Sequence, residues 1–264
     1  MIRRGVAETP FGKLHYRSAG GGEKAFVCIH GLGQTSLYWE QVIQDLPAGW
    51  QGYAVDLLGF GESDRLEGSY SIDLHAESVA AMIAGLAQKR VVLGANSLGG
   101  VVAMRLVIRA LARLDGLFLT ATGPKVGNPD GLRAYRDRLS TIDINADQMR
   151  PIVTGFTHQK LPEVLVSKMA DEMAKSQRSA MTDTLLSSLD TDLVADLPLI
   201  KVPTLILQGA EDKGRTVADG VTVINGVADG TLVVLPRVGH TPMLEAAGAF
   251  QFWLNQTLEH WSPD

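Results

Sequence analysis

Residues 94–100 read Gly-Ala-Asn-Ser-Leu-Gly-Gly, and this segment says most about the chain. It follows the apolar run 90–93 and precedes a helix-like segment, 101–111. Ala95 and Gly99 lie two positions before and two after Ser97, where a larger side chain would collide with a neighbouring strand or helix. The pattern predicts a strand that turns sharply into a helix and holds the Ser97 hydroxyl clear of the sheet edge, an arrangement known as a nucleophile elbow.

The segment alone leaves one alternative open. An ordinary Gly/Ser-rich loop between a strand and a helix has a similar composition, and Ala95 stands where this elbow usually has glycine. Alanine still meets the steric demand. The rest of the chain therefore decides between the two interpretations.

Length and composition indicate an ordinary globular α/β protein. The 264 residues fit one large domain, or a core domain with an insertion, and 45% are hydrophobic while 20% are charged. The net charge is −5, and charged residues of both signs are scattered along the chain. This gives no support to binding of nucleic acid or of an anionic membrane. Cys28 is the single cysteine and lies in the apolar run 25–29. We expect a buried strand residue rather than a catalytic thiol, and no intrachain disulfide.

The chain shows no targeting or membrane signal. Residues 1–5 carry charge but no apolar segment of a secretory signal follows them. No segment approaches the ~20 apolar residues of a membrane span. We expect a soluble, cytoplasmic protein.

Hydrophobic periodicity predicts strands that alternate with helices. Alternation of this kind favours a mostly parallel, doubly wound sheet covered on both faces, after an opening antiparallel hairpin. The expected strands are 2–8, 13–18, 25–29, 52–56, 90–94, 115–120, 203–208 and 231–235, and the expected helices lie near 36–46, 72–87, 101–111, 215–225 and 242–260.

The alternation is interrupted between residues 124 and 197. This segment contains no convincing strand, and its apolar residues recur at helical spacing. We interpret it as a helical lid inserted between two parts of an α/β core, 1–123 and 198–264. Four methionines suit an adaptable apolar pocket wall, and packing between the lid helices is the equal alternative. They are Met149, Met169, Met173 and Met181.

Two later loops supply partners for Ser97. An activated serine needs a general base and a group that orients the base. Asp212 follows the expected strand 203–208, and His240 follows the expected strand 231–235. Because parallel strands point their carboxyl ends the same way, we expect both side chains at the sheet edge that carries Ser97. Glu211 remains the alternative acid.

A glycine-rich loop at residues 30–33, His-Gly-Leu-Gly, follows the expected strand 25–29. Glycines let backbone N–H groups approach a ligand closely. We expect the N–H groups of Leu32 and Leu98 to form an oxyanion hole, and we interpret His30 as a residue that stabilises this loop rather than as a base.

Together these elements resemble the α/β-hydrolase superfamily over nearly the whole chain. The resemblance implies a catalytic triad of Ser97, Asp212 and His240, acyl transfer through an acyl-enzyme, and no metal or organic cofactor. Many members carry proline four residues after the acid, where this chain has Thr216. The matching segments are 30–31 with Trp39, 56–63, the elbow 94–100, Asp212, and 239–240 followed by Glu245.

The expected function is a serine hydrolase for a small, largely apolar carboxylic ester or lactone. Dehalogenases and epoxide hydrolases of this superfamily use a carboxylate at the elbow, so Ser97 argues against both. The elbow also looks like that of meta-cleavage-product hydrolases, which cut carbon–carbon bonds. Those enzymes usually place tryptophan close after the histidine, whereas Thr241 and Pro242 follow here. A ligand receptor with little turnover is the third alternative. The expected partner is a small-molecule substrate, not nucleic acid or a membrane, and the sequence does not indicate an oligomeric state.

Overall fold

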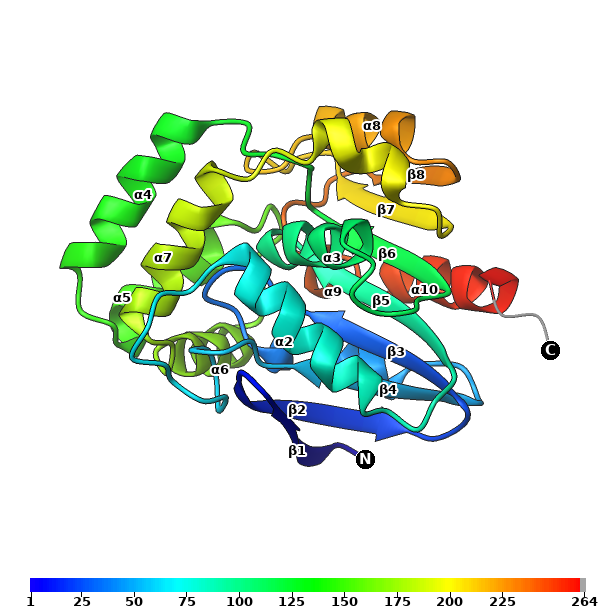
Figure 1. Ribbon diagram of the computed structural model, residues 1–264. Coiled ribbons are helices and arrows are strands. Elements are labelled where there is room, and N and C mark those ends of the chain that lie inside the picture. Colours follow the sequence, from blue (N-terminus) through cyan, green and yellow to red (C-terminus); the bar gives the residue numbers. More distant parts are fainter. Residues whose placement is uncertain (262–264) are drawn as a thin grey trace.

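The computed structural model describes residues 1–261 of the chain. Its centre is a mixed β-sheet with helices on both faces (Figure 1). Its eight described strands follow the order β1-β2-β4-β3-β5-β6-β7-β8. The pairings β1·β2 and β2·β4 are antiparallel and the other five are parallel, which confirms the predicted α/β class. The strands are β1 (Arg3–Thr9), β2 (Gly12–Gly20), β3 (Lys24–Ile29), β4 (Trp50–Val55), β5 (Arg90–Asn96), β6 (Gly116–Thr120), β7 (Thr204–Gly209) and β8 (Gly230–Leu235).

The predicted opening hairpin is confirmed. Strands β1 and β2 pair in register up to Thr9 and Gly12, so that Pro10 and Phe11 form the turn. Gly12 has φ +128, a backbone conformation that L side chains rarely adopt. Strand β2 then pairs with β4 and attaches the hairpin to the edge of the parallel strands.

Helices cover both faces of the sheet. Helices α2 and α3 pack against each other on the front face in Figure 1, and α10 lies behind the strands. On that rear face Phe250 of α10 contacts Phe118 of β6 and Trp39, with ring centroids 5.5 and 6.0 Å apart. The helices outside the insertion are η1 (Ser36–Trp39), α1 (Glu40–Gln44), α2 (Ile72–Ala84), α3 (Leu98–Ile108), α8 (Val217–Gly226), α9 (Pro242–Glu245) and α10 (Ala247–Trp261).

The central strands form the core. Strands β3, β5 and β6 are buried almost throughout, and their residues are near-continuously apolar, as expected for parallel strands with helices on both faces. Cys28 is buried in β3, as predicted. Burial raises the pKa of its thiol well above the usual value. Cys28 is therefore an apolar packing residue.

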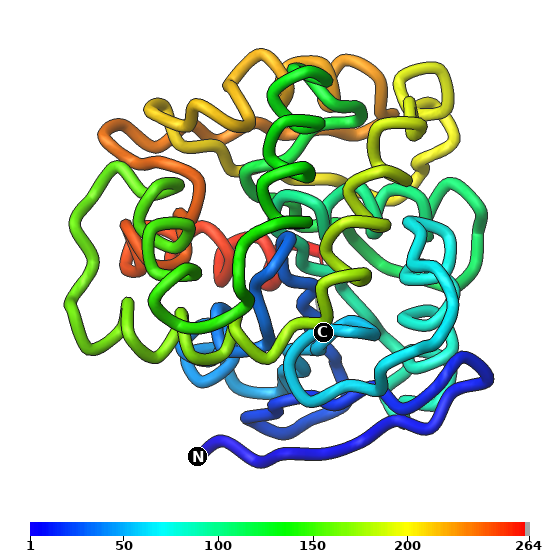
Figure 2. Tube along the Cα trace, turned by 90° about the vertical axis from the view of Figure 1, so that its left-hand side faces the viewer, coloured from blue at the N-terminus to red at the C-terminus, as the bar shows by residue number. Residues whose placement is uncertain are grey.

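A helical insertion separates β6 from β7, and no described residue between them lies in a strand. Figure 1 places the helices of residues 129–189 beyond the carboxyl ends of the parallel strands, and Figure 2 looks onto them, drawn in green to yellow-green. Asn128 begins the first helix because its side chain accepts a hydrogen bond from the N–H of Gly131. The elements are α4 (Pro129–Thr141), α5 (Ala146–Gly155), α6 (Glu163–Met173), α7 (Arg178–Leu189) and the short η2 (Val194–Leu199).

The structure corrects the predicted C-terminal helix. The continuous helix expected over 242–260 is instead two helices, because Ala246 leaves helical geometry with φ −139 and ψ 48. The short α9 thereby sets Glu245 beside the loop that carries His240. None of the helices within residues 1–261 is long and apolar enough to cross a membrane.

Candidate active site

Ser97 lies at a sharp turn between β5 and α3, as the sequence predicts. Its backbone has φ 55 and ψ −118, a strained conformation for a residue other than glycine. A side chain at Gly99 would place its Cβ only 2.4 Å from the carbonyl oxygen of His30. The turn is held by the Ser97 N–H, which donates to the carbonyl of Thr120 at 3.0 Å. The elbow geometry is therefore present.

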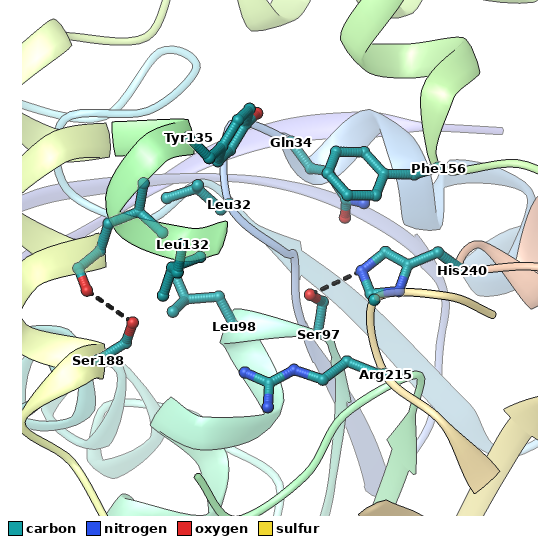
Figure 3. A pocket seen from close by; sticks show the side chains of 12 residues that line it. Leu32, Gln34, Ser97, Leu98, Leu132, Tyr135, Phe156, Ser188, Arg215 and His240 are labelled. Carbon is teal, nitrogen blue, oxygen red and sulfur yellow. Dashed lines mark hydrogen bonds between the residues drawn. The ribbon is translucent and has the colours of Figure 1, made fainter. Parts of the chain in front are cut away.

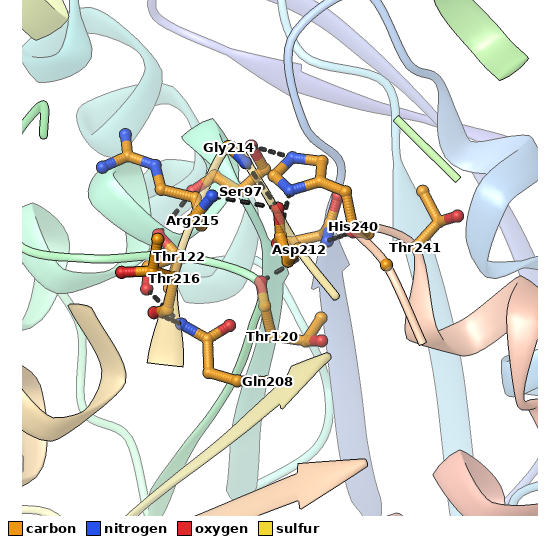
Figure 4. Close-up of polar contacts among 12 residues, drawn as sticks. Ser97, Thr120, Thr122, Gln208, Asp212, Gly214, Arg215, Thr216, His240 and Thr241 are labelled. Atoms are coloured by element: carbon orange, nitrogen blue, oxygen red, sulfur yellow. Dashed lines mark hydrogen bonds and ion pairs between the residues drawn. The ribbon is translucent and has the colours of Figure 1, made fainter. Parts of the chain in front are cut away.

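A chain of hydrogen bonds joins Ser97, His240 and Asp212 (Figures 3 and 4). The Nε2 atom of His240 lies 2.8 Å from Ser97 Oγ, and its Nδ1 atom lies 2.8 Å from Asp212 Oδ2. A carboxylate can only accept, so Nδ1 carries the proton and Nε2 is free to accept the serine proton. The Asp212 side chain is 1% exposed and that of His240 is 9% exposed. This is the arrangement that general-base activation of a serine requires.

Asp212, not Glu211, contacts the histidine. Its second oxygen, Oδ1, accepts hydrogen bonds from the backbone N–H groups of Gly214 and Arg215 at 2.8 and 3.0 Å, which fixes the carboxylate. Glu211 is exposed. Thr216, at the position where the sequence resemblance implied proline in many members, donates its own N–H to Asp219 at 2.7 Å and caps the start of α8. Proline has no N–H to donate, so this capping bond replaces the conformational restriction that proline would impose.

The two predicted oxyanion donors lie beside Ser97. Leu98 is the first residue of α3, so its N–H has no carbonyl acceptor within the helix. The N–H of Leu32 makes no backbone hydrogen bond with any residue of 1–261. Leu32 and Leu98 both line the pocket that contains Ser97 (Figure 3).

His30 stabilises the glycine-rich loop, in agreement with the sequence interpretation. Its Nδ1 lies 2.7 Å from the carbonyl of Gly31, and its Nε2 accepts the N–H of Leu57 at 3.0 Å. Burial lowers the pKa of this imidazole, which keeps it neutral. The loop is further held by Gln34, whose side-chain oxygen accepts the Gly31 N–H at 2.8 Å.

A pocket of about 140 Å³ opens over Ser97. A cavity of about 150 Å³ holds one benzene-sized molecule, so the space suits a small substrate. The sequence suggested the insertion's methionines as a pocket wall, but none of the four lines this pocket, and all four are buried. The lining residues are Leu32, Gln34, Ser97, Leu98, Leu132, Tyr135, Phe156, Leu185, Ser188, Gly214, Arg215 and His240.

Sequence reasoning missed Phe156 and Arg215. Phe156 follows α5, and its ring centroid lies 5.3 Å from that of His240. The backbone carbonyl of Phe156 accepts a hydrogen bond from the backbone N–H of His240 at 3.0 Å. No sequence pattern places it there, because an irregular loop of the insertion brings it to the site. Arg215 could have been noticed, since it follows the candidate acid Asp212 by three residues in the same loop.

Comparison with protein families matches residues 26–250 to the alpha/beta hydrolase family. The chain belongs to this family. The match confirms the resemblance seen in the sequence, and the arrangement of strands and helices agrees with it.

Named relatives of this alpha/beta hydrolase include two curated enzymes. The 3-oxoadipate enol-lactonase 2 of Acinetobacter baylyi is 25% identical, over 90% of this chain and 90% of its own length. A 2-hydroxy-6-oxononadienedioate/2-hydroxy-6-oxononatrienedioate hydrolase of Paraburkholderia xenovorans is 26% identical, over 98% and 94%. The solved structure of the esterase EaEST from Exiguobacterium antarcticum superposes with a TM-score of 0.88 at 20% identity, over 96% of this chain and 98% of its own, a likeness of fold alone. Family and relatives together make the chain a hydrolase.

Proposed function

We propose that this alpha/beta hydrolase is a serine hydrolase that cleaves a small carboxylic ester or lactone through an acyl-enzyme. The observation that carries the proposal is the hydrogen-bonded chain from Asp212 through His240 to Ser97, whose hydroxyl lies in a pocket of about 140 Å³. The relative named an enol-lactonase supports the choice of an ester-type bond.

The proposed reaction follows from the positions of these groups. His240 accepts the hydroxyl proton through Nε2 while Ser97 Oγ attacks the substrate carbonyl. Asp212 holds the imidazole in the tautomer that leaves Nε2 free and stabilises the imidazolium that forms. The imidazolium then donates its proton to the leaving alcohol, and water, activated by the same imidazole, hydrolyses the acyl-enzyme.

The negative oxygen of the tetrahedral intermediate needs donors in place before it forms. The N–H groups of Leu32 and Leu98 lie beside Ser97 without an acceptor in their own helix or loop, so we assign this role to them. Each such donor stabilises the transition state by about 2.7–4 kcal/mol.

Hydrolysis of p-nitrophenyl esters of increasing acyl length tests the proposal, with Ser97→Ala beside the wild type. Loss of a triad serine lowers kcat by about 10⁶-fold in enzymes of this mechanism. Ser140→Ala, an exposed change on α4, is the matched control and should leave kcat unaltered. A maximum in the rate of hydrolysis at one acyl length would indicate the length of acyl chain that the pocket accommodates. Equal rates for the wild type and Ser97→Ala on every ester would overturn the proposal.

A second candidate function is cleavage of a ring-fission diketone at a carbon–carbon bond. The relative named 2-hydroxy-6-oxononadienedioate/2-hydroxy-6-oxononatrienedioate hydrolase favours it. Spectroscopic loss of such a diketone that depends on Ser97, with no turnover of esters, would establish this candidate instead. A rise in the melting temperature with ligand, without multiple turnover of esters or of ring-fission diketones, would indicate a receptor.

A further inference from the structure

Arg215 brings a positive charge into a pocket that is otherwise mainly apolar. It lies in the loop between β7 and α8, and its side chain lines the same pocket as Ser97. In Figure 3 the guanidinium points into the pocket on the side of Ser97 away from His240. The surrounding side chains include Leu98 and Leu132. A charged group in such surroundings is costly unless an anion or hydrogen-bond acceptors offset the lost hydration.

The protein itself offsets little of that cost. One guanidinium nitrogen of Arg215 donates to the backbone carbonyl of Lys125. Within residues 1–261 Arg215 forms no ion pair with a carboxylate. Burial lowers the pKa of its guanidinium, and the nearby charges of Asp219 and Asp212 counteract that effect only in part.

Both of these carboxylates are occupied elsewhere. Asp212 binds His240 and the backbone N–H groups of Gly214 and Arg215. Asp219 accepts from the N–H and the hydroxyl of Thr216. Since a guanidinium carries five N–H donors in a planar fork, most of the donors of Arg215 are left for a molecule in the pocket.

We propose that Arg215 binds a carboxylate of the substrate, so that the substrate is a small ester or lactone with a second acid group a few bonds from the scissile carbonyl. This inference rests on the proposed function and narrows its substrate class. A planar carboxylate matches the guanidinium fork with two parallel hydrogen bonds. Pairing inside the pocket offsets the desolvation of Arg215 and positions the scissile carbonyl over Ser97.

Pairs of methyl esters that differ only in the distal acid group test the inference. Monomethyl glutarate is compared with methyl pentanoate, and monomethyl adipate with methyl hexanoate, by titration of the acid released. We expect the charged ester of a pair to have the higher kcat/KM in the wild type. The ratio within that pair should fall about 10- to 100-fold in Arg215→Met, the usual size of a hydrogen bond to a charged group.

Two further variants separate recognition from other effects. Arg215→Lys keeps the charge but loses the fork, so its ratio should lie between those of the wild type and Arg215→Met. Arg133→Met removes a positive charge from the surface of the insertion, where Arg133 pairs with Asp130 at 3.2 Å, and should leave the ratio unaltered. A role of Arg215 limited to holding the Lys125 loop would lower both rates of a pair alike and overturn the inference.

A binding measurement distinguishes failure of this inference from failure of the proposed function. Glutarate is titrated into the wild type, Ser97→Ala and Arg215→Met proteins by calorimetry. Binding that is retained in Ser97→Ala and lost in Arg215→Met supports the carboxylate site even if no ester is hydrolysed. Turnover of esters without preference for the charged one, and without glutarate binding, overturns the inference while the serine hydrolase stands.

Discussion

Backbone strain at Ser97 depends on the absence of a side chain two residues later. Ser97 holds φ 55, and α3 begins directly after it, so close to β3 that the Gly99 Cα lies against the backbone of the loop at residues 30–33. A Cβ at Gly99 would lie 2.4 Å from the His30 carbonyl oxygen and 2.8 Å from that of Ile29. Both obstacles are backbone atoms, which move only together with β3 and the loop at residues 30–33.

Gly99→Ala should therefore destabilise the fold by about 1–3 kcal/mol and displace Ser97 from His240. Urea unfolding and ester kcat measure the two effects. Gly248→Ala is the matched control, because a Cβ there meets nothing within 4 Å, and alanine in a helix gains about 0.5–1 kcal/mol over glycine. Equal stability of the two variants would contradict the steric argument.

The second prediction at the scale of residues concerns which of two adjacent acids, Asp212 or Glu211, orients the catalytic histidine in the proposed reaction. Asp212→Asn keeps the shape of the side chain but favours the wrong imidazole tautomer, and kcat should fall about 10⁴-fold. Glu211→Gln, at an exposed side chain, should leave kcat within twofold. Ester kinetics on both variants check this, and a larger loss in Glu211→Gln would reassign the acid.

At the scale of elements, Glu245 connects the insertion to the loop that carries His240. Its Oε2 accepts the backbone N–H groups of His158, Gln159 and Gly239 at 2.7–2.9 Å. Its Oε1 accepts from the N–H and hydroxyl of Thr241 at 3.0 and 3.1 Å. One carboxylate thus fixes the residues on both sides of His240 and the segment after α5.

Glu245→Gln should loosen this connection, because an amide nitrogen cannot accept the N–H groups that a carboxylate oxygen accepts. We expect a loss of about 1–3 kcal/mol in the free energy of unfolding and a fall in kcat that exceeds any change in KM. Glu259→Gln on the exposed face of α10 is the control. Unaltered stability and kcat in Glu245→Gln would show that the loop is held by other contacts.

The sequence predicted the elements of the core better than the interior of the insertion. Strand and helix periods are local, and the elbow and the loops after β7 and β8 follow from the geometry of a parallel sheet. Position and the superfamily resemblance therefore pointed to Ser97, Asp212 and His240, while Glu211 stayed open as the acid until the side-chain contacts were known. The pocket wall depends on how α4, α5 and α7 pack, which no local period encodes. Phe156 lies in an irregular loop and was missed for that reason.

At the scale of the whole molecule, polar contacts attach the insertion to the core. Arg17 of β2 pairs with Glu172 of α6 at 3.4 Å. On the other side, His75 of α2 lies fully buried, with Nε2 3.0 Å from the hydroxyl of Thr184 on α7. That hydroxyl donates to the carbonyl of Ala180 and so accepts from the Nε2–H of His75. The folded state keeps His75 neutral because full burial disfavours the charged imidazolium.

Stability should fall in acid through His75. Burial lowers the pKa of this imidazole from 6.5 to about 3. Between these two values the unfolded chain binds one proton more than the folded chain, so the contribution is fully present above pH 6.5 and is lost as the pH falls toward 3. A difference of one bound proton changes the free energy of unfolding by about 1.4 kcal/mol per pH unit. His75 should therefore lower the free energy of unfolding by about 2–3 kcal/mol between pH 6.5 and 4.5.

His75→Gln keeps an N–H donor without a titrating ring. In urea unfolding across this pH range, the variant should lose about 2–3 kcal/mol less of its free energy of unfolding than the wild type loses. His260→Gln, near the C-terminal end of α10, is the matched control, and identical slopes for the wild type and His75→Gln would show that another group controls the acid sensitivity.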